Sequence, residues 1–100
     1  MIKSSGYRVY PKEIVDHILS HASVKEAVVF GVKDEKKGQS IFCEVQLKKG
    51  TLLSEVEIKQ FLSNRLPTYM IPSKIFFVES FPRTSSGKIR LSEVEKKYHG

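Results

Sequence analysis

The chain has 100 residues, 40% of them hydrophobic, and its 17 Lys and Arg against 11 Asp and Glu give a net charge of +6. This composition excludes a disordered chain and predicts one small folded domain with a modest core. The positive charge favours an anionic partner, such as nucleic acid, an acidic membrane or a phosphorylated small molecule, although solubility alone would account for a charge of this size.

The first twenty residues predict a hairpin followed by a helix. Residues 1–10 alternate weakly, and Ser5 and Gly6 form a turn signal in their middle. Pro11 suits the first position of a helix, which is expected to end near His21. The apolar residues of this helix fall on one face: Ile14, Val15, Ile18, Leu19 and Ala22.

Two strands are predicted next. Residues 26–32 (EAVVFGV) form a short continuous apolar run, which is typical of a strand buried on both faces. Residues 33–39 form a charged turn, and residues 41–48 (IFCEVQLK) then alternate as in a strand that is covered on one face. The inward residues would be Ile41, Cys43, Val45 and Leu47, and the outward ones Glu44, Gln46 and Lys48.

A second helix is predicted after a glycine-containing loop. Ser54, with Glu57 three residues later, forms a capping box, so the helix should begin there and continue to about Asn64. Its inward residues would be Ile58, Phe61 and Leu62. Pro67 stops the helix because its ring does not fit a helix interior.

The last third of the chain predicts an extended loop, a strand and a short helix. Residues 65–72 (RLPTYMIP) contain two prolines and should be extended, and residues 74–81 (KIFFVESF) form a third strand. A loop with Lys88 follows, and a short helix begins at about Ser92. The predicted fold is α+β: an opening β-hairpin, then a three-stranded sheet with two helices packed on it and a short C-terminal helix. Such a fold leaves no deep pocket of its own, so a substrate site is expected at an edge shared with something larger.

The loop of residues 81–90 (FPRTSSGKIR) invites comparison with nucleotide-binding P-loops, but it is not one. Pro82 stands where the first glycine belongs and has no N–H to offer a phosphate. Ile89 stands where the metal-binding hydroxyl belongs. The lysine at the tip therefore needs another explanation.

The shape of this loop is specified by its own residues. Pro82 makes its entry rigid, and Gly87 allows a free φ beside Lys88. The turn can also be tied to its own backbone by the hydroxyl groups of Thr84, Ser85 and Ser86. A fixed loop with one long cation suits the delivery of positive charge to a phosphate that is held elsewhere.

The histidines and the cysteine carry weaker signals. His17 and His21 have the i, i+4 spacing of a metal pair, but no third ligand accompanies them and His99 lies at the terminus, so no metal is expected. Cys43 is the only cysteine, which excludes an internal disulfide and fits a reducing, cytoplasmic compartment. Its inward position predicts a small core residue. No apolar run approaches the length of a membrane span.

The order of helices and strands, together with the charge, also raises the hypothesis of an RNA-binding module. Such modules stack bases on aromatic residues of their central strands, but Gln39 and Ile41 occupy the corresponding positions here. Glu44 would present a negative charge to phosphates. The predicted strand faces therefore argue against nucleic acid as a partner.

Four stretches give the chain a resemblance to a known family. They are residues 2–14 (IKSSGYRVYPKEI), 24–39 (VKEAVVFGVKDEKKGQ), 65–78 (RLPTYMIPSKIFFV) and 82–89 (PRTSSGKI). In this order and spacing they resemble the small C-terminal domain of the adenylate-forming (AMP-binding) superfamily. That superfamily includes acyl-CoA synthetases, adenylation domains of peptide synthetases and beetle luciferases.

The resemblance implies a two-step ligase. A carboxylic acid first reacts with ATP, in the presence of Mg²⁺, to give an acyl-adenylate and pyrophosphate, and Lys88 matches the family lysine that serves this step. The small domain then swings, and the opening hairpin helps to form a channel for the thiol of CoA or of phosphopantetheine. Gly6 matches the glycine that lets the backbone approach the thiol arm closely.

The resemblance also implies roles for the neighbours of these residues. Arg8 is the candidate to bind a phosphate of AMP or CoA. The other members of the hairpin motif are Lys3, Ser4, Ser5 and Tyr7. Pro82, Thr84 and Gly87 would shape the loop that bears Lys88.

The resemblance further implies that residues 1–100 are a single mobile C-terminal domain of an AMP-forming acyl-CoA synthetase of fatty acid metabolism. A large N-terminal domain that binds ATP and the acid would be its main partner, and the isolated 100 residues are expected to be inactive. The acceptor would be CoA, or alternatively a carrier protein. An excised domain is favoured over a free-standing subunit, and a non-catalytic basic binding module is the alternative of a different class.

Overall fold

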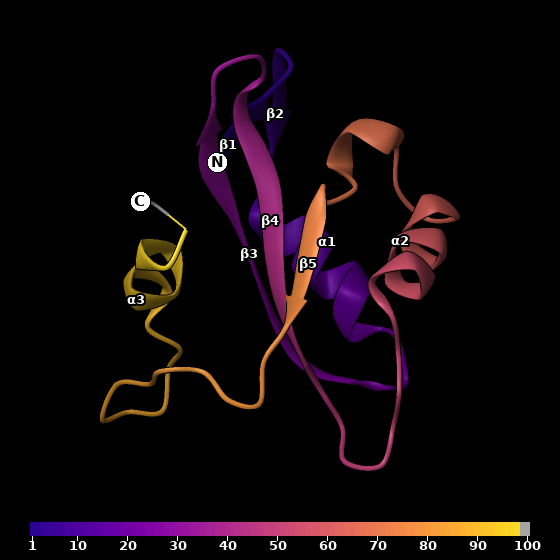
Figure 1. Ribbon diagram of the computed structural model, residues 1–100, viewed down its shortest axis with the longest axis vertical. Helices are drawn as coiled ribbons and strands as arrows, with labels where there is room; N and C mark the ends of the chain where they lie inside the picture. Colours follow the sequence, from indigo (N-terminus) through magenta and orange to yellow (C-terminus); the bar gives the residue numbers. More distant parts are fainter. Residues whose placement is uncertain (99–100) are drawn as a thin grey trace.

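In the computed structural model, which describes residues 1–98, five strands form one sheet whose two faces are covered by three α-helices (Figure 1). The elements in chain order are β1 (Ile2–Ser4), β2 (Tyr7–Val9), α1 (Pro11–Leu19), β3 (Val24–Asp34), β4 (Gly38–Leu47), α2 (Glu55–Ser63), the 3-10 turn η1 (Thr68–Met70), β5 (Lys74–Phe77) and α3 (Leu91–Lys96). The predicted α+β class is confirmed.

Strand β4 is the centre of the sheet. It pairs antiparallel with β3 along its whole length. Its other edge is shared by β1, which meets it where Ser4 lies beside Gly38, and by β5, which runs parallel to residues 42–45. The predicted three-stranded sheet is therefore β3, β4 and β5, and the predicted hairpin adds two strands to the same sheet.

The opening hairpin turns at the predicted place. Ser5 has a φ of 52° and Gly6 a φ of 83°, and a tight two-residue turn with both central residues in this left-handed region matches the twist of the flanking strands. The N–H of Ser5 donates a hydrogen bond of 2.9 Å to the carbonyl of Lys37 in the turn between β3 and β4. The hairpin tip is thereby tied to the end of the central strand pair.

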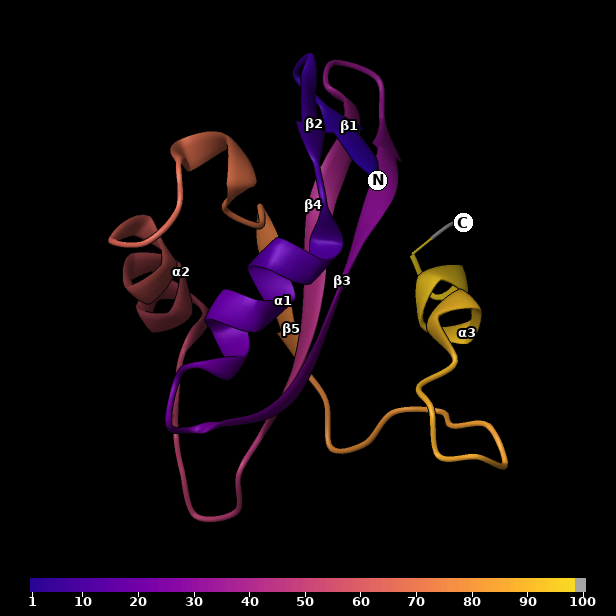
Figure 2. The same cartoon turned by 180° about the vertical axis from the view of Figure 1, so that it is seen from behind.

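Helices α1 and α2 cover one face of the sheet (Figure 2). Helix α1 buries Ile14 and Ile18, and α2 buries Ile58 and Leu62. The capping box of α2 is confirmed, because Ser54 and Glu57 exchange side-chain to backbone hydrogen bonds. The remaining core residues of this face come from the strands and from η1: Ile2, Val9, Val24, Ala27, Val29, Ile41, Cys43, Val45, Met70 and Ile75.

Helix α3 covers the opposite face, over a second and smaller core. Val94 of α3 is fully buried there, and the other buried members are Val28, Phe30 and Phe81. The alternation of β3 sends its residues in turn to the two cores. The predicted short C-terminal helix is confirmed, and it lies apart from the other two helices.

Glu44 corrects the prediction that β4 shows a solvent-exposed face. Its side chain is 0% exposed. Its carboxylate accepts a hydrogen bond of 2.5 Å from the Tyr98 hydroxyl and forms an ion pair of 2.6 Å with Lys97. Glu44 is the single acidic residue of β4. The cause is α3, which covers this face. Burial, followed by the bond to Glu44, raises the pKa of the Tyr98 phenol above its ordinary value.

Several element boundaries also differ from the prediction. The charged turn predicted over residues 33–39 is shorter, because β3 continues to Asp34 and β4 begins at Gly38. Helix α1 ends at Leu19, which is 43% exposed, and so Leu19 and Ala22 are not core residues. The segment of residues 65–72 is not fully extended, because it contains η1, which buries Met70. Strand β5 stops at Phe77, four residues before the predicted end.

Candidate functional site

The loop that bears Lys88 is closed by hydrogen bonds of its own backbone. The N–H of Thr84 donates to the carbonyl of Lys88 at 2.8 Å, and the N–H of Gly87 donates to the carbonyl of Thr84 at 2.9 Å. Gly87 has a φ of 88°, which a residue with a side chain rarely adopts. The loop is thus a tight turn of defined shape.

The hydroxyl of Thr84 completes this turn. It accepts the N–H of Lys88 at 3.2 Å and lies 2.9 Å from the hydroxyl of Ser86. The carbonyl of Pro82 accepts the N–H of Arg90 at 2.8 Å, which joins the two sides of the loop at its base. Side chain and backbone together leave the main chain of Lys88 little freedom.

The ammonium group of Lys88, in contrast, is available to a ligand. Its residue is exposed, and within residues 1–98 no hydrogen bond or ion pair holds the side chain. The base of the loop is anchored by Phe81, which is buried, and by Ile89, which packs on the smaller core. The arrangement presents one free cation on a fixed support.

The second predicted group lies on the opening hairpin. Gly6 stands at its tip, and an added Cβ there would meet no atom within 4 Å. Tyr7 and Arg8 are exposed on β2, Lys3 is exposed on β1, and Ser4 is buried. The structure therefore places a bare stretch of backbone between two exposed cations.

A tyrosine that sequence reasoning missed supports this hairpin. Tyr7 stacks on Tyr69 of η1 with ring centroids 4.0 Å apart and an interplanar angle of 9°. The hairpin is further held on β1, where the N–H of Lys3 donates 2.9 Å to the side-chain carbonyl of Gln39. Only the aromatic character of residue 69 hinted at this contact in the sequence.

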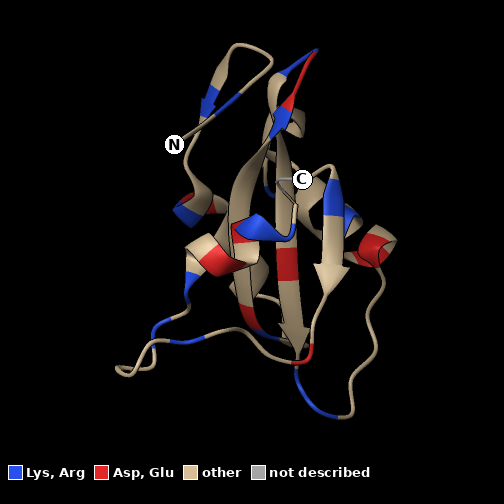
Figure 3. Ribbon diagram, turned by 60° about the vertical axis from the view of Figure 1, so that its left-hand side comes forward, with Lys and Arg blue, Asp and Glu red and all other residues tan. Residues whose placement is uncertain are grey.

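The structure does not bring the two groups together. The hairpin tip and the loop between β5 and α3 lie toward opposite ends of the molecule in both views (Figures 1 and 2). Basic residues are found at both ends, in the turn between β3 and β4 and in the segment before α3 (Figure 3). The hairpin tip and the Lys88 loop are thus separate parts of the surface of this domain.

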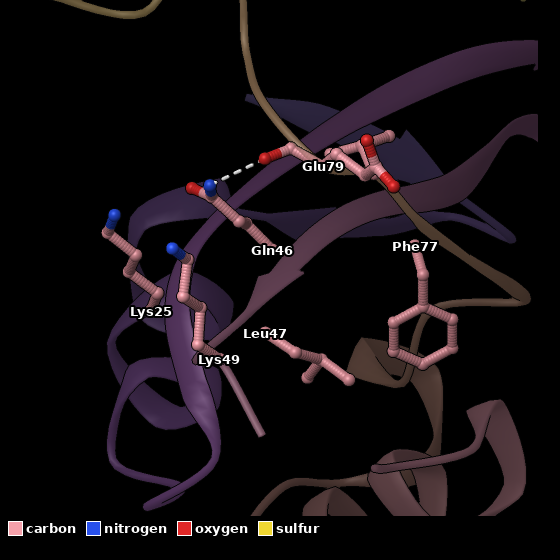
Figure 4. Close-up of a pocket in the computed structure, with 7 residues that line it drawn as sticks. Lys25, Gln46, Leu47, Lys49, Phe77 and Glu79 are labelled. Carbon is pink, nitrogen blue, oxygen red and sulfur yellow. Dashed lines mark hydrogen bonds between the residues drawn. The ribbon is translucent and has the colours of Figure 1, made fainter. Parts of the chain in front are cut away.

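A surface pocket of about 610 Å³ lies where β3 begins and β4 and β5 end (Figure 4). Phe77 and Leu47 form its apolar side, and Lys25 and Lys49 approach it from another side (Figure 4). None of its lining residues is buried, so it is an open depression. No predicted site residue lines it.

His21 and Cys43, whose sequence signals were weaker, take part in local packing and hydrogen bonding. His21 lies beyond the end of α1, accepts the N–H of Ser23 at 3.0 Å and packs edge-on against Phe61. Among residues 1–98, no three His, Cys, Asp or Glu side chains come together as metal ligands, and His99 lies outside the described residues. Cys43 is a core residue, as predicted, and burial raises the pKa of its thiol, with a smaller effect of the neighbouring Glu44 charge.

None of the helices described over residues 1–98 combines the length and apolar character needed to span a membrane.

On the α3 face, the rings of Phe42 and Phe76 pack against Tyr98. These aromatic residues lie far apart in the sequence, which does not show that they form a cluster on the sheet. The ring of Tyr98 lies against both phenylalanine rings on this face.

Comparison with known proteins gives a consistent result. The family model described as the AMP-binding enzyme C-terminal domain matches residues 13–88. The mitochondrial medium-chain acyl-CoA ligase ACSF2 of Mus musculus is 43% identical over 90 residues, which are 90% of this chain and 15% of that protein. The mitochondrial malonate–CoA ligase ACSF3 of Homo sapiens is 36% identical over 99 residues, which are 99% of this chain and 17% of that protein.

Solved structures agree with these relatives. A Mycobacterium tuberculosis fatty acyl CoA synthetase superposes with a TM-score of 0.90 and 36% identity over 98% of this chain and 19% of its own. ATP-bound MatB from Rhodopseudomonas palustris superposes with a TM-score of 0.92 and 29% identity over 96% of this chain and 19% of its own. The chain spans less than a fifth of the length of each of these relatives.

Proposed function

The chain belongs to the AMP-binding enzyme C-terminal domain family of the acyl-CoA ligase superfamily, and we propose that it is the mobile domain of an AMP-forming acid–thiol ligase. In this proposal a larger domain holds ATP and the carboxylic acid, and this domain supplies Lys88 for the first step. The observation that carries the proposal is the free ammonium of Lys88 on a loop whose main chain is fixed.

The first step transfers the adenylyl group to the acid. A carboxylate oxygen attacks the α-phosphorus of ATP, and the bond to pyrophosphate breaks. Negative charge then shifts between the carboxylate, the α-phosphate and the leaving group. A lysine that contacts these oxygens stabilises the transition state more than the ground state. The same positive charge would be less effective on a mobile loop, because ordering it would cost conformational entropy.

The second step transfers the acyl group to a thiol, and here the proposal assigns the hairpin. Gly6 offers backbone without a side chain and with open space around it, which suits close passage of a narrow thiol-bearing arm. Lys3 and Arg8 are exposed beside it and suit a phosphate group. Since the hairpin and the Lys88 loop lie toward opposite ends, the proposal requires the domain to rotate between the two steps.

The proposal also covers the thiol acceptor and the metal ion. Relatives are named as CoA ligases, which favours CoA over a carrier protein as the acceptor. No cluster of acidic ligands in residues 1–98 fits Mg²⁺, so the proposal assigns the metal to the larger domain together with ATP. A cytoplasmic location stays a prediction, and some relatives carry a mitochondrial name.

The test is acid-dependent exchange of pyrophosphate into ATP by the intact protein that contains this domain. Lys88→Ala is expected to lower the exchange rate by about 100- to 1,000-fold, as for the loss of other donors that stabilise transition-state charge. Lys36→Ala, which removes an exposed lysine from the turn between β3 and β4, is the matched control and should keep the normal rate. Exchange in Lys88→Ala at the rate of the control would contradict the proposal.

A further inference from the structure

The side chain of Arg83 connects the tip of the Lys88 loop to the sheet. Its Nη2 forms an ion pair with the carboxylate of Glu26 on β3. Its Nη1 donates a hydrogen bond of 2.9 Å to the carbonyl of Gly87. The planar guanidinium presents several donors in a fixed geometry, so that one side chain can hold both partners at once.

Glu26 reaches this loop because of an irregularity in β3. Val24 pairs with Leu47 and Glu26 with Gln46, so Lys25 is an extra residue that forms a bulge. Without it, Val24 and Glu26 would point to the same face. With it, Val24 joins the core under α1 and α2. Glu26, two residues before Val28, shares the face of Val28 and points to the α3 side. The bulge thus directs a carboxylate toward the loop.

The carbonyl that Arg83 holds belongs to the peptide group directly before Lys88. The other polar atoms around Lys88 are held inside the turn, since its N–H and its carbonyl both bond to Thr84. The backbone oxygen of Arg83 accepts a bond of 3.2 Å from Nε of Arg90, which fixes the start of the loop as well. Within residues 1–98, Arg83 is the side chain that links the loop tip to a strand of the sheet, through its hydrogen bond to Gly87 and its ion pair with Glu26.

The exposure of this pair indicates a role in geometry rather than in stability. The side chains of Arg83 and Glu26 are 38% and 33% exposed. Ion pairs with this access to water contribute little to folding, because water and salt screen them. Their effect on the direction of the Gly87 carbonyl does not depend on such a contribution.

We propose that Arg83 is a positioning residue for Lys88 and that Glu26 holds Arg83 in place. This inference rests on the proposed function, in which the Lys88 ammonium meets the reacting oxygens. A loop tip that turns about its stem would move the ammonium by ångströms, and misplacement on that scale lowers rates by about 100-fold. Binding of ATP by the larger domain would be unaffected.

The experiment measures both half-reactions in the intact protein that contains this domain. Arg83→Lys keeps the charge but cannot span both partners, and Glu26→Gln keeps the size but removes the ion pair. For both we expect a fall in kcat for adenylation, by about 10- to 100-fold in Arg83→Lys, with a KM for ATP within about twofold of normal. Thioester formation from supplied acyl-adenylate should stay normal. Arg65→Gln, which removes an exposed arginine on the far side of the sheet, is the control.

Exchanging the two residues separates positioning from stability. In the double variant Glu26→Arg/Arg83→Glu the ion pair can form again, but a glutamate cannot donate to the Gly87 carbonyl. The midpoint of urea unfolding should stay near the normal value in the single variants and in the double variant, because the exposed pair contributes little to folding, whereas adenylation stays low. Recovery of adenylation in this double variant, or normal adenylation in Arg83→Lys, would overturn the inference. Normal exchange in Lys88→Ala would overturn the proposed function and this inference with it, whereas a defect confined to Lys88→Ala would overturn the inference alone.

Discussion

Tyr7 and Tyr69 form one of the contacts that hold the opening hairpin against the rest of the domain. Strands β1 and β2 have three residues each, and hairpins of this size are marginal without support. The two rings are 50% and 38% exposed, yet they lie nearly parallel at 4.0 Å. Stacked aromatic pairs contribute about 0.5–1.5 kcal/mol beyond the area that they bury.

Removing one ring should therefore act on the second half-reaction alone. We expect Tyr69→Ala to slow thioester formation from acyl-adenylate severalfold in the intact protein, because the hairpin loses one of its supports, and to leave pyrophosphate exchange unchanged. Tyr69→Phe keeps the stack and serves as the control, with normal rates in both assays. Equal rates in the Ala and Phe variants would show that the stack has no part in the thiol step.

At the scale of residues, the sequence predicts local contacts and misses distant ones. The shape of the Lys88 loop follows from Pro82, Thr84 and Gly87, because each acts on the backbone within a few residues of itself. The pair of Arg83 and Glu26 joins positions 57 apart, and nothing in the local pattern indicates it. The bulge at Lys25 was equally hidden, because a continuous apolar run has no alternation in which an extra residue would stand out.

At the scale of elements, caps and turns were predicted well, and one strand face was not. Ser54 begins α2, Pro11 begins α1, and Ser5 and Gly6 turn the hairpin, since each of these signals acts through backbone geometry. Helix α3 has six residues and few apolar ones, so its sequence does not show which face of the sheet it covers. The burial of Glu44 follows from that docking and could not be predicted without it.

The buried carboxylate of Glu44 gives an asymmetric prediction for the stability of this domain. One of its oxygens, Oε1, has no hydrogen-bond partner, and the other depends on Lys97 and Tyr98. Lys97→Ala should lower the free energy of unfolding by roughly 1–3 kcal/mol, because it removes a partner from a buried charge. Glu44→Met should lower it less than Lys97→Ala does, because it removes the buried charge itself, and Lys97, which is 50% exposed, can turn to water.

Urea unfolding measures both values. Lys96→Ala is the control for the loss of a lysine from α3, since Lys96 is exposed, and it should change the free energy of unfolding by less than about 0.5 kcal/mol. A larger loss for Glu44→Met than for Lys97→Ala would contradict this account. It would mean that the carboxylate itself is a main source of the docking energy of α3.

At the scale of the molecule, the two segments to which we assign the half-reactions lie toward opposite ends of the domain (Figures 1 and 2). Strands β3 and β4, which pair over ten positions, run between them. The sequence contains the motifs and their order, but only the folded chain shows that the hairpin and the Lys88 loop lie toward opposite ends of the domain (Figures 1 and 2). The net charge of +6 is compatible with phosphate-bearing ligands at either end.

The most direct test of this account compares Gly6→Val and Lys88→Ala in both half-reactions of the intact protein. Gly50→Val is the control for backbone strain, because Gly6 and Gly50 have φ values of 83° and 79° and equally open surroundings. We expect a crossed result. Lys88→Ala loses pyrophosphate exchange and keeps thioester formation from acyl-adenylate, whereas Gly6→Val keeps exchange and loses thioester formation, and Gly50→Val keeps both. Loss of both half-reactions in either site variant, with Gly50→Val active, would contradict the assignment of one step to each end of the domain.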